Sequence, residues 1–208
     1  MSTNPLSDQT VAYYDANAER YARDTLGLCM EPLYEPFLYH VPAGGHILDV
    51  GCGSGRDALA FQRRGFRTTA IDASSAMARL ASERTGQTVV WLRVQDLRCE
   101  NEFDGVWACA SLLHVPAEEM DGVFARLTPA LRPGGVWYMS FKLGEAEEVR
   151  EGRLFSDYTE RSLRELVGRH PLLEFVRVWV TDDVRPGQSG QRWLNALVRK
   201  VNVPGGRR

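Results

Sequence analysis

Apolar residues follow two different periods through the middle of the chain. Short continuous apolar or β-branched runs are typical of buried strands, and five occur, at residues 46–50, 66–71, 88–94, 103–110 and 136–141. Between them, apolar residues at three- and four-residue spacing predict helices over 56–64, 74–84 and 116–131. Strands that alternate with helices in this way form a parallel sheet with right-handed crossovers.

The end of the chain departs from this alternation. A helix is predicted over 159–169, and two strands, 174–180 and 192–200, then follow each other with only a loop between them. Consecutive strands joined without a helix pair in antiparallel fashion. The expected fold class is therefore α/β, with one Rossmann-like, doubly wound sheet of about seven strands whose last strand is antiparallel.

An N-terminal helical segment precedes the sheet. Tyr14, Ala18, Tyr21 and Ala22 share one face of this predicted helix. Because the helix has no partner within its own segment, we expect that face to lie over the ligand-binding edge of the sheet.

The chain is expected to form a single domain over residues 1–203. It would consist of a helical cap (1–42), a core (45–142), and a loop with the final strands (143–203). The Gly-rich, charged residues 204–208 are expected to form a flexible tail.

Composition narrows the functional classes. The formal net charge of −2 over 208 residues gives no general attraction to nucleic acid. The polar N-terminus lacks a signal pattern, and no apolar stretch approaches the roughly 20 residues of a membrane span. The four cysteines are scattered, with neither a CxxC pair nor a His cluster, so we expect no metal site and a reducing, cytoplasmic location.

The stretch ILDVGCGSGRD, residues 47–57, places Gly51, Gly53 and Gly55 directly after the first strand. Such a loop suits a tight turn, a dinucleotide, or another nucleotide-like ligand, because glycine lets backbone N–H groups approach a ligand closely. A dinucleotide fingerprint would need glycine at position 56, where this chain has Arg56.

Three further predicted strands are followed by residues suited to ligand binding. Ligands of open α/β sheets bind at the edge formed by the carboxyl ends of the strands. Asp72 follows Gly51 by 21 residues, the spacing at which a carboxylate accepts hydrogen bonds from ribose hydroxyls. Asp96 and Leu97 together suit an adenine. The Asp96 carboxylate would accept a hydrogen bond from the adenine amine, and the apolar Leu97 side chain would cover the ring. The segment from Ala110 to His114 follows the fourth strand.

The sequences DVGCGSG, AIDAS and VQDL together resemble the class I S-adenosylmethionine-dependent methyltransferases over about residues 45–142. YYDANAERYARDT and GCGSGRDAL are most similar to the small-molecule methyltransferases that include tellurite-resistance and ubiquinone-pathway enzymes. The resemblance implies a transferase that moves a methyl group from S-adenosylmethionine to a small-molecule acceptor by in-line displacement, leaving S-adenosylhomocysteine.

The resemblance also implies cofactor-binding residues. The backbone around Gly51 and Gly53 would hold the methionine part, Asp49 would orient the loop or approach the ligand's ammonium, and Ala110 would contact the methionyl chain. The adenosine would be held by a second set of residues: Asp72 at the ribose, Ala73 and Met77 beside the adenine, and Asp96 and Leu97 at its edge. Tyr14 and Tyr21 would close over the sulfonium, which aromatic faces attract.

The residues that would bind the methyl acceptor are less clearly indicated by the sequence than those that would bind the cofactor. His114 is the candidate general base, since histidine is the usual base near neutral pH, although it also suits a turn that closes on the backbone. Cationic and aromatic residues after the fifth strand and in the later loop form either a substrate rim or a solvated surface of mixed charge: Lys142, Arg153, Tyr158 and Arg185.

Other functions remain open. No Asp/Asn-Pro-Pro-Tyr follows the fourth strand, which disfavours DNA or glutamine amines as acceptors. An NAD(P)-linked oxidoreductase would share the sheet and Asp72, and Arg56 counts against it. A non-catalytic S-adenosylmethionine-binding protein would share every cofactor residue. The sequence carries no signal for the oligomeric state or for the identity of the acceptor.

Overall fold

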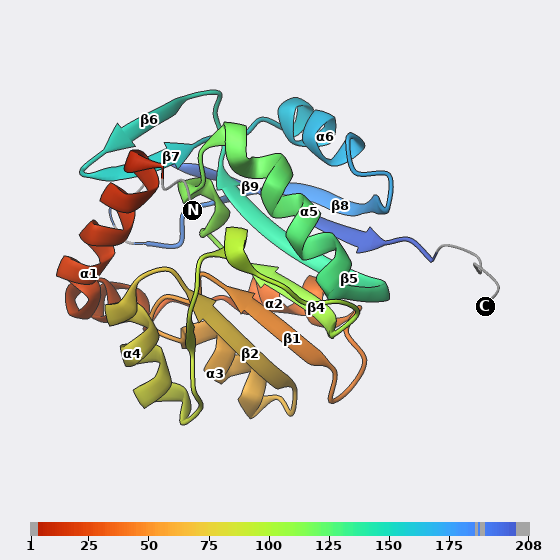
Figure 1. Ribbon diagram of the computed structural model, residues 1–208, viewed down its shortest axis with the longest axis horizontal. Helices are drawn as coiled ribbons and strands as arrows, with labels where there is room; N and C mark the ends of the chain where they lie inside the picture. The colour runs from red at the N-terminus through yellow and green to blue at the C-terminus, as the bar shows by residue number, and fades with distance from the viewer. Residues whose placement is uncertain (1–3, 186, 188–189, 203–208) are drawn as a thin grey trace.

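The computed structural model describes residues 4–185, 187 and 190–202, so the predicted tail at 204–208 lies outside the described residues. Its main feature is a seven-stranded sheet (Figure 1). In spatial order the strands are β3 (Val90–Trp91), β2 (Arg67–Asp72), β1 (His46–Val50), β4 (Phe103–Ala108), β5 (Leu131–Lys142), β9 (Arg192–Lys200) and β8 (Leu173–Asp182).

The sheet topology confirms the expected fold class. Strands β1 to β5 pair in parallel, whereas β9 lies antiparallel between β5 and β8. The chain runs outward from β1 to β3 and then returns to place β4 on the other side of β1. This reversal opens a crevice at the carboxyl ends of β1 and β4, where ligands of such sheets bind.

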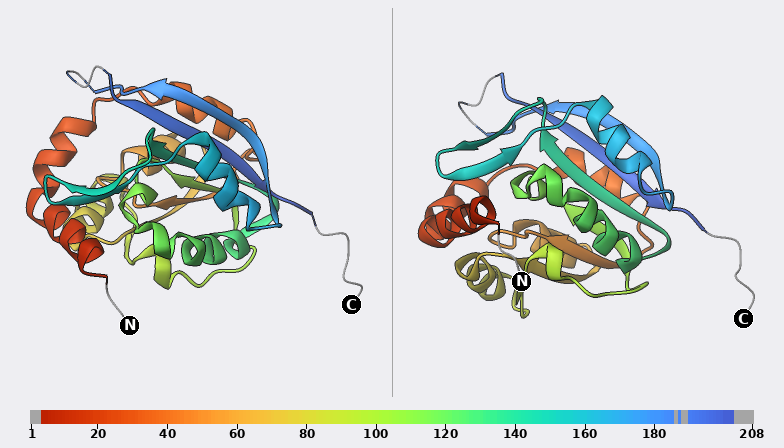
Figure 2. Two further views of the ribbon diagram at one scale, coloured as in Figure 1. Left: turned by 90° about the horizontal axis from the view of Figure 1, so that it is seen from above. Right: turned by 45° about the horizontal axis from the view of Figure 1, so that its top comes forward.

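Helices cover both faces of the sheet (Figure 2). Their bounds are α1 (Pro5–Thr25), α2 (Glu31–Leu38), α3 (Arg56–Arg63), α4 (Ser75–Thr85), α5 (Met120–Ala130) and α6 (Glu160–Gly168). Helices α5 and α6 share one apolar core with the sheet, while α2 and α3 share a second core on the opposite face, and α4 packs with α3 beside β2. Among the described residues, no helix is long and apolar enough to cross a membrane.

The two central strands β4 and β5 contribute large aromatic side chains to both cores. Trp107 and Tyr138 stack with their ring centroids 4.1 Å apart on the α2–α3 face. On the other face, Trp137 packs 4.5 Å from Phe124 of α5. Strands buried on both faces have continuous apolar sequences, which is the pattern that predicted them.

Helix α1 lies across one end of the sheet and is held there by polar contacts (Figure 2). Asp15 Oδ1 accepts hydrogen bonds from Ser74 Oγ (2.6 Å) and the Ala76 amide (3.0 Å) at the start of α4. Thr10 Oγ1 accepts one from the Leu154 amide (2.9 Å). The helix therefore covers the ligand-binding edge, as its apolar face predicts.

Two predicted segments differ in the structure. The strand expected over 88–94 is reduced to Val90–Trp91, because the chain turns into a 3-10 helix at Val94–Asp96. The loop expected after β5 instead contains a hairpin, β6 (Glu147–Arg150) and β7 (Arg153–Ser156). Its turn, Glu151–Gly152, has positive φ at both residues. Asn-Gly and Asp-Gly are the usual signals for such a turn, so Glu-Gly was a weak one.

We expect Gly105→Ala to destabilise the fold, because β4 approaches α2 closely at this position. A Cβ at Gly105 would lie 2.7 Å from Phe37 Cζ and 3.0 Å from Val41 Cγ2. Overpacking of this kind costs about 1–3 kcal/mol, measured by urea unfolding. Gly122→Ala in α5 is the matched control, since a Cβ there meets nothing within 4 Å, and we expect no loss of stability. Equal stability of the two variants would contradict the packing described here.

Candidate functional site

A cavity of about 160 Å³ opens at the carboxyl ends of β1, β2 and β4, beneath α1. Most of the residues predicted for cofactor binding line it: Tyr14, Tyr21, Asp49, Gly51, Gly53, Asp72, Ala73, Met77 and Ala110. The topology brings them together because the parallel strands end side by side at this edge. We call this space the first cavity.

The glycine loop shapes the floor of the first cavity. Gly51 has φ +65°, and a Cβ there would lie 2.6 Å from Ser111 Cβ, so only glycine allows the two strand ends to approach. The Gly51 and Cys52 amides donate to the Ile71 carbonyl at 2.9 and 3.1 Å. The Gly53 amide donates to Asp72 Oδ2 at 2.8 Å.

Asp72 joins two loops and lies in the wall of the first cavity. Its Oδ2 accepts from Gly53, and its Oδ1 accepts from the Ser74 amide at 2.8 Å. Burial raises the pKa of Asp72 to about 6, against the two amide hydrogen bonds that favour its ionised form. The carboxylate is therefore ionised at neutral pH, and its oxygens keep lone pairs for a ligand's hydroxyl groups.

Asp49 leaves an unpaired acceptor in the same wall. The residue is 2% exposed, and its Oδ2 has no hydrogen-bond partner among the described residues. Burial raises the pKa of Asp49 well above its usual value, and the negative charges of Asp57 and Asp72 add to this effect. A cationic donor from a ligand would satisfy the orphaned oxygen and favour the ionised form.

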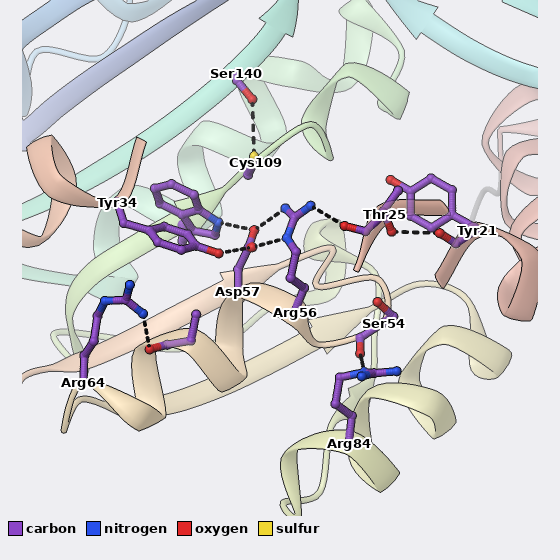
Figure 3. A network of polar contacts seen from close by, with 12 residues as sticks. Tyr21, Thr25, Tyr34, Ser54, Arg56, Asp57, Arg64, Arg84, Cys109 and Ser140 are labelled. Atoms are coloured by element: carbon purple, nitrogen blue, oxygen red, sulfur yellow. Dashed lines mark hydrogen bonds and ion pairs between the residues drawn. The ribbon is translucent and has the colours of Figure 1, made fainter. Parts of the chain in front are cut away.

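A buried network of charged and aromatic groups supports the wall (Figure 3). Asp57 accepts from Arg56 Nε (2.6 Å) and Nη2 (2.9 Å), from the Tyr34 hydroxyl (2.5 Å) and from Trp107 Nε1 (2.9 Å). Burial alone would raise the pKa of Asp57, but the ion pair and these hydrogen bonds hold it below its usual value. Arg56 Nη1 also donates to the Thr25 carbonyl at 3.3 Å, which ties the end of α1 to the wall.

His114 and Tyr14 form a hydrogen-bonded pair between two cavities. His114 Nδ1 lies 2.6 Å from the Leu154 carbonyl, which can only accept, so the ring proton is on Nδ1. His114 Nε2 therefore accepts from the Tyr14 hydroxyl at 2.8 Å. Burial, with the nearby charges of Arg153 and Lys142, lowers the pKa of His114 to about 4, so the ring is neutral at pH 7.

A second cavity of about 300 Å³ adjoins the first and shares Tyr14, Ala110 and His114 with it. It is enclosed by the β6–β7 hairpin, the end of β5, and residues 183–185 after β8. The structure thus provides two neighbouring cavities, and the side chains of Tyr14 and His114 line both of them.

The predicted substrate rim is only partly brought together. Lys142, Arg153 and Arg185 line the second cavity. Tyr158 does not, because its ring packs 4.5 Å from Phe141 in the core and the residue is only 8% exposed.

Two residues predicted at the adenine also lie elsewhere. Asp96 and Leu97 do not line the first cavity, and Leu97 is buried in the α5–α6 core. The 3-10 helix at Val94–Asp96 shifts the chain, so that Val94 and Gln95 reach the cavity instead. The roles of Asp96 and Leu97 stay predictions.

Sequence reasoning missed several lining residues. Arg56 lines both cavities, although the sequence predicts it only as the first residue of the helix over 56–64. Cys109 also lines both, and burial raises the pKa of its thiol to about 12, so it is protonated at neutral pH. The position of Arg56 within the glycine loop was a usable signal, whereas the chain around Cys109 carries none.

Comparison with known proteins finds similarity to methyltransferases. A family model described as a methyltransferase domain matches residues 47–135. A ubiquinone biosynthesis O-methyltransferase of Xanthomonas axonopodis pv. citri is 36% identical over 106 residues, which cover 48% of this chain and 44% of that protein. The chain thus spans less than half the length of this curated relative.

Solved structures match over nearly the whole chain. The 1,6-didemethyltoxoflavin-N1-methyltransferase of Burkholderia thailandensis, solved with 1,6-didemethyltoxoflavin and S-adenosylhomocysteine, has a TM-score of 0.75 and 25% identity. That match covers 97% of this chain and 92% of the other. The cyclase SpnF has a TM-score of 0.77 at 17% identity, covers 98% and 99% of the two chains, and shows the fold alone.

We expect Asp57→Asn to lower the free energy of unfolding by about 3 kcal/mol, because it leaves the Arg56 guanidinium, on a side chain only 21% exposed, without a counter-charge. Arg79→Gln is the control, since Arg79 pairs with Glu83 on the exposed face of α4 and such pairs contribute less than about 1 kcal/mol. Chemical unfolding of both variants measures the difference. Equal losses would contradict a structural role for the Asp57 network.

The tautomer of His114 is open to nuclear magnetic resonance. We expect ¹⁵N shifts of a neutral ring with its proton on Nδ1 at pH 6, and titration only near pH 4. Tyr14→Phe should move the Nε2 resonance and leave Nδ1 in place, because it removes only the hydroxyl bonded to Nε2. A ring that is half protonated near pH 6.5 would contradict the described burial.

Proposed function

We propose that this chain, which is built on a class I S-adenosylmethionine-dependent methyltransferase domain, transfers a methyl group to a small-molecule acceptor by in-line displacement. The first cavity would hold the cofactor and the second the acceptor. The observation that carries the proposal is that Tyr14, Ala110 and His114 line both cavities. Molecules bound in the two cavities would therefore lie next to each other at these residues.

The residues of the first cavity fit S-adenosylmethionine. The orphaned Asp49 oxygen suits the ammonium of its methionine part, which would approach along the Gly51–Gly53 backbone. Asp72 would accept from the ribose hydroxyls, and Met77 with Val94 and Gln95 would border the adenine. When bound, the cofactor supplies an activated methyl group on a sulfonium.

Tyr14 and Tyr21 form the aromatic part of the wall. Their rings lie edge to face with centroids 5.3 Å apart, and burial raises the pKa of both hydroxyls. The rings therefore stay neutral and present faces that attract a cation. With both ligands bound, the two rings would also help to exclude water from the region between the cavities, which would favour methyl transfer to the acceptor over hydrolysis.

Catalysis by this chain would depend mainly on orientation. Holding two reactants in line is worth roughly 7–11 kcal/mol of barrier. Where the acceptor must lose a proton, His114 Nε2 is the available base, and the proton would reach it through the Tyr14 hydroxyl that already occupies that nitrogen. Cys109 stays protonated and so does not compete for the methyl group.

The rival functions have distinct consequences. A dinucleotide site is disfavoured, because Arg56 replaces the third glycine and is already paired with Asp57. A non-catalytic binder would keep the first cavity, and the matching fold of the cyclase SpnF shows that this architecture occurs in a protein named for another reaction. The proposal also includes a reducing, cytoplasmic location, which the free state of all four cysteines fits.

Acceptor-dependent formation of S-adenosylhomocysteine tests the proposed activity. We expect a library of small phenols, carboxylates and heterocycles to contain compounds that trigger it, and Asp72→Ala to abolish it. Binding of S-adenosylmethionine with no acceptor-dependent product would favour the non-catalytic alternative. Tight binding of NADH would favour the oxidoreductase.

Cofactor affinity should depend on pH through Asp72. The ionised carboxylate is the form that accepts two hydroxyl hydrogen bonds, so affinity is full above the pKa of about 6 and falls as Asp72 takes up a proton below it. Between pH 7 and pH 5 we expect about a ten-fold loss of S-adenosylhomocysteine affinity by calorimetry. Asp72→Asn should bind weakly at both pH values; an unchanged pH profile in this variant would assign the effect to another group.

The proton route predicts matched kinetic defects. With an acceptor that loses a proton, Tyr14→Phe and His114→Gln should each slow single-turnover transfer by about 100-fold, and the double variant should be no slower. His170→Gln is the control, because His170 bonds Asp121 away from both cavities. Full transfer rate in His114→Gln at every pH would rule out this histidine as the base.

A further inference from the structure

Resting on the proposed function, we infer that the second cavity takes an acceptor with an anionic oxygen group on an apolar body. Two cationic side chains in its wall, Lys142 and Arg153, carry charge or donors that no residue described by the structure satisfies. The opposite wall is apolar. An organic acid is the class of small molecule that suits both walls at once.

Five cationic residues line the second cavity, and most are already neutralised. Three form close ion pairs at 2.6 Å: Arg56 with Asp57, Arg185 with Asp183, and Arg150 with both Glu148 and Asp157. These pairs hold the cavity walls in place and leave little charge for a ligand.

Lys142 and Arg153 differ from these three. Lys142, at the end of β5, forms no ion pair with any residue that the structure describes, and its Nζ lies 4.0 Å from the Phe155 ring centroid. Arg153 touches Glu151 at 3.0 Å, but that glutamate side chain is 81% exposed. Arg153 Nε is buried without any partner among the described residues. A buried donor without an acceptor is costly, so a ligand oxygen there is favourable.

The positive charges around Lys142 favour binding of an anion in the second cavity. Burial and the neighbouring charges of Arg150, Arg185 and Arg153 lower the pKa of Lys142, against the opposing effect of Asp157. Burial is the main cause of the lowered pKa of His114, and the charges of Arg153 and Lys142 add to it.

The acidic residues of the lining do not cancel this charge. Asp183 is paired with Arg185, Glu151 is exposed beside Arg153, and Asp182 is exposed on β8. A negative group placed between Lys142 and Arg153 would therefore relieve like-charge repulsion that remains in the free protein.

The remaining wall determines the rest of the ligand. Leu28, Met30 and Leu33 line the side formed by the α1–α2 connection, and Leu113 lies near His114. An apolar ring or chain would bury its surface there while its charged group faces the hairpin. Because the cavity also reaches Tyr14 and Ala110, a methyl-accepting atom would lie at the wall shared with the first cavity.

Calorimetry on protein saturated with S-adenosylhomocysteine tests the inference with benzoate, phenylphosphonate and the neutral isostere benzamide. We expect at least one anion to bind about ten-fold more tightly than benzamide, the value of one charge-assisted hydrogen bond. The two anions differentiate a carboxylate site from a phosphonate site. No preference for either anion over benzamide overturns the inference.

Variants assign the effect to the two residues. Lys142→Met and Arg153→Gln should each weaken anion binding about ten-fold, Arg153→Lys should retain part of it, and all should keep S-adenosylhomocysteine affinity. Arg161→Gln, which removes an exposed charge from α6, should leave anion binding unchanged. Anion binding that is equally tight in Lys142→Met and Arg153→Gln would overturn the inference.

The same titrations keep the two proposals apart. If the wild-type protein does not bind S-adenosylhomocysteine but, titrated without it, still prefers the anions, the proposed methyl transfer fails and the anion site remains. If it binds S-adenosylhomocysteine without any anion preference, the anionic acceptor fails and the proposed function remains. Thermal unfolding of each variant confirms that lost binding is not lost folding.

Discussion

A single buried carboxylate connects the two loops on which the cofactor side of the site depends. Asp72 accepts the Gly53 amide on one oxygen and the Ser74 amide on the other, each at 2.8 Å. The first bond sets the glycine loop after β1, and the second sets the start of α4. Ser74 in turn caps α4 and bonds Asp15, so α1 is positioned over the cavity by the same chain of contacts. Burial also raises the pKa of Asp72. The charge of the carboxylate that holds the two loops therefore depends on pH.

The acceptor side depends on a different kind of constraint. The β6–β7 hairpin is held by the backbone and side chains of neighbouring segments: Leu154 bonds both Thr10 and His114, and Ser156 Oγ donates to the Val115 carbonyl at 2.9 Å. His114 therefore keeps one tautomer and one orientation, with Tyr14 on its other nitrogen. The same hairpin carries Arg153 and Phe155, so one element places both the proposed base, His114, and the proposed cationic wall.

Much of the fold and of the cofactor side was predictable because both depend on local patterns. Continuous apolar runs located the strands, and the helical spacing over 74–84 located α4 to within one residue at each end. Parallel strands then carried Asp49, Asp72 and the glycine loop to one edge. The short β3 and the 3-10 helix after it were not predictable, because β-branched residues at 88–94 favour a strand that the tertiary structure ends early.

The acceptor side was less predictable because it depends on contacts between distant segments. A Glu-Gly turn is a weak hairpin signal, so the segment around residues 147–156 read as a loop. Charge alone did not distinguish Lys142 and Arg153 from the cations that form close ion pairs, such as Arg185 with Asp183 two residues before it. Tyr158 read as part of a rim, but the packing of β5 takes its ring into the core.

A crystal structure of the protein with S-adenosylhomocysteine would test the central claim most directly. The account predicts the ribose at Asp72, the methionine part along Gly51 and Gly53 with its ammonium at Asp49, and the sulfur facing the wall of Tyr14 and His114. A ligand bound in the second cavity, or a first cavity that stays empty at saturating concentration, would contradict it.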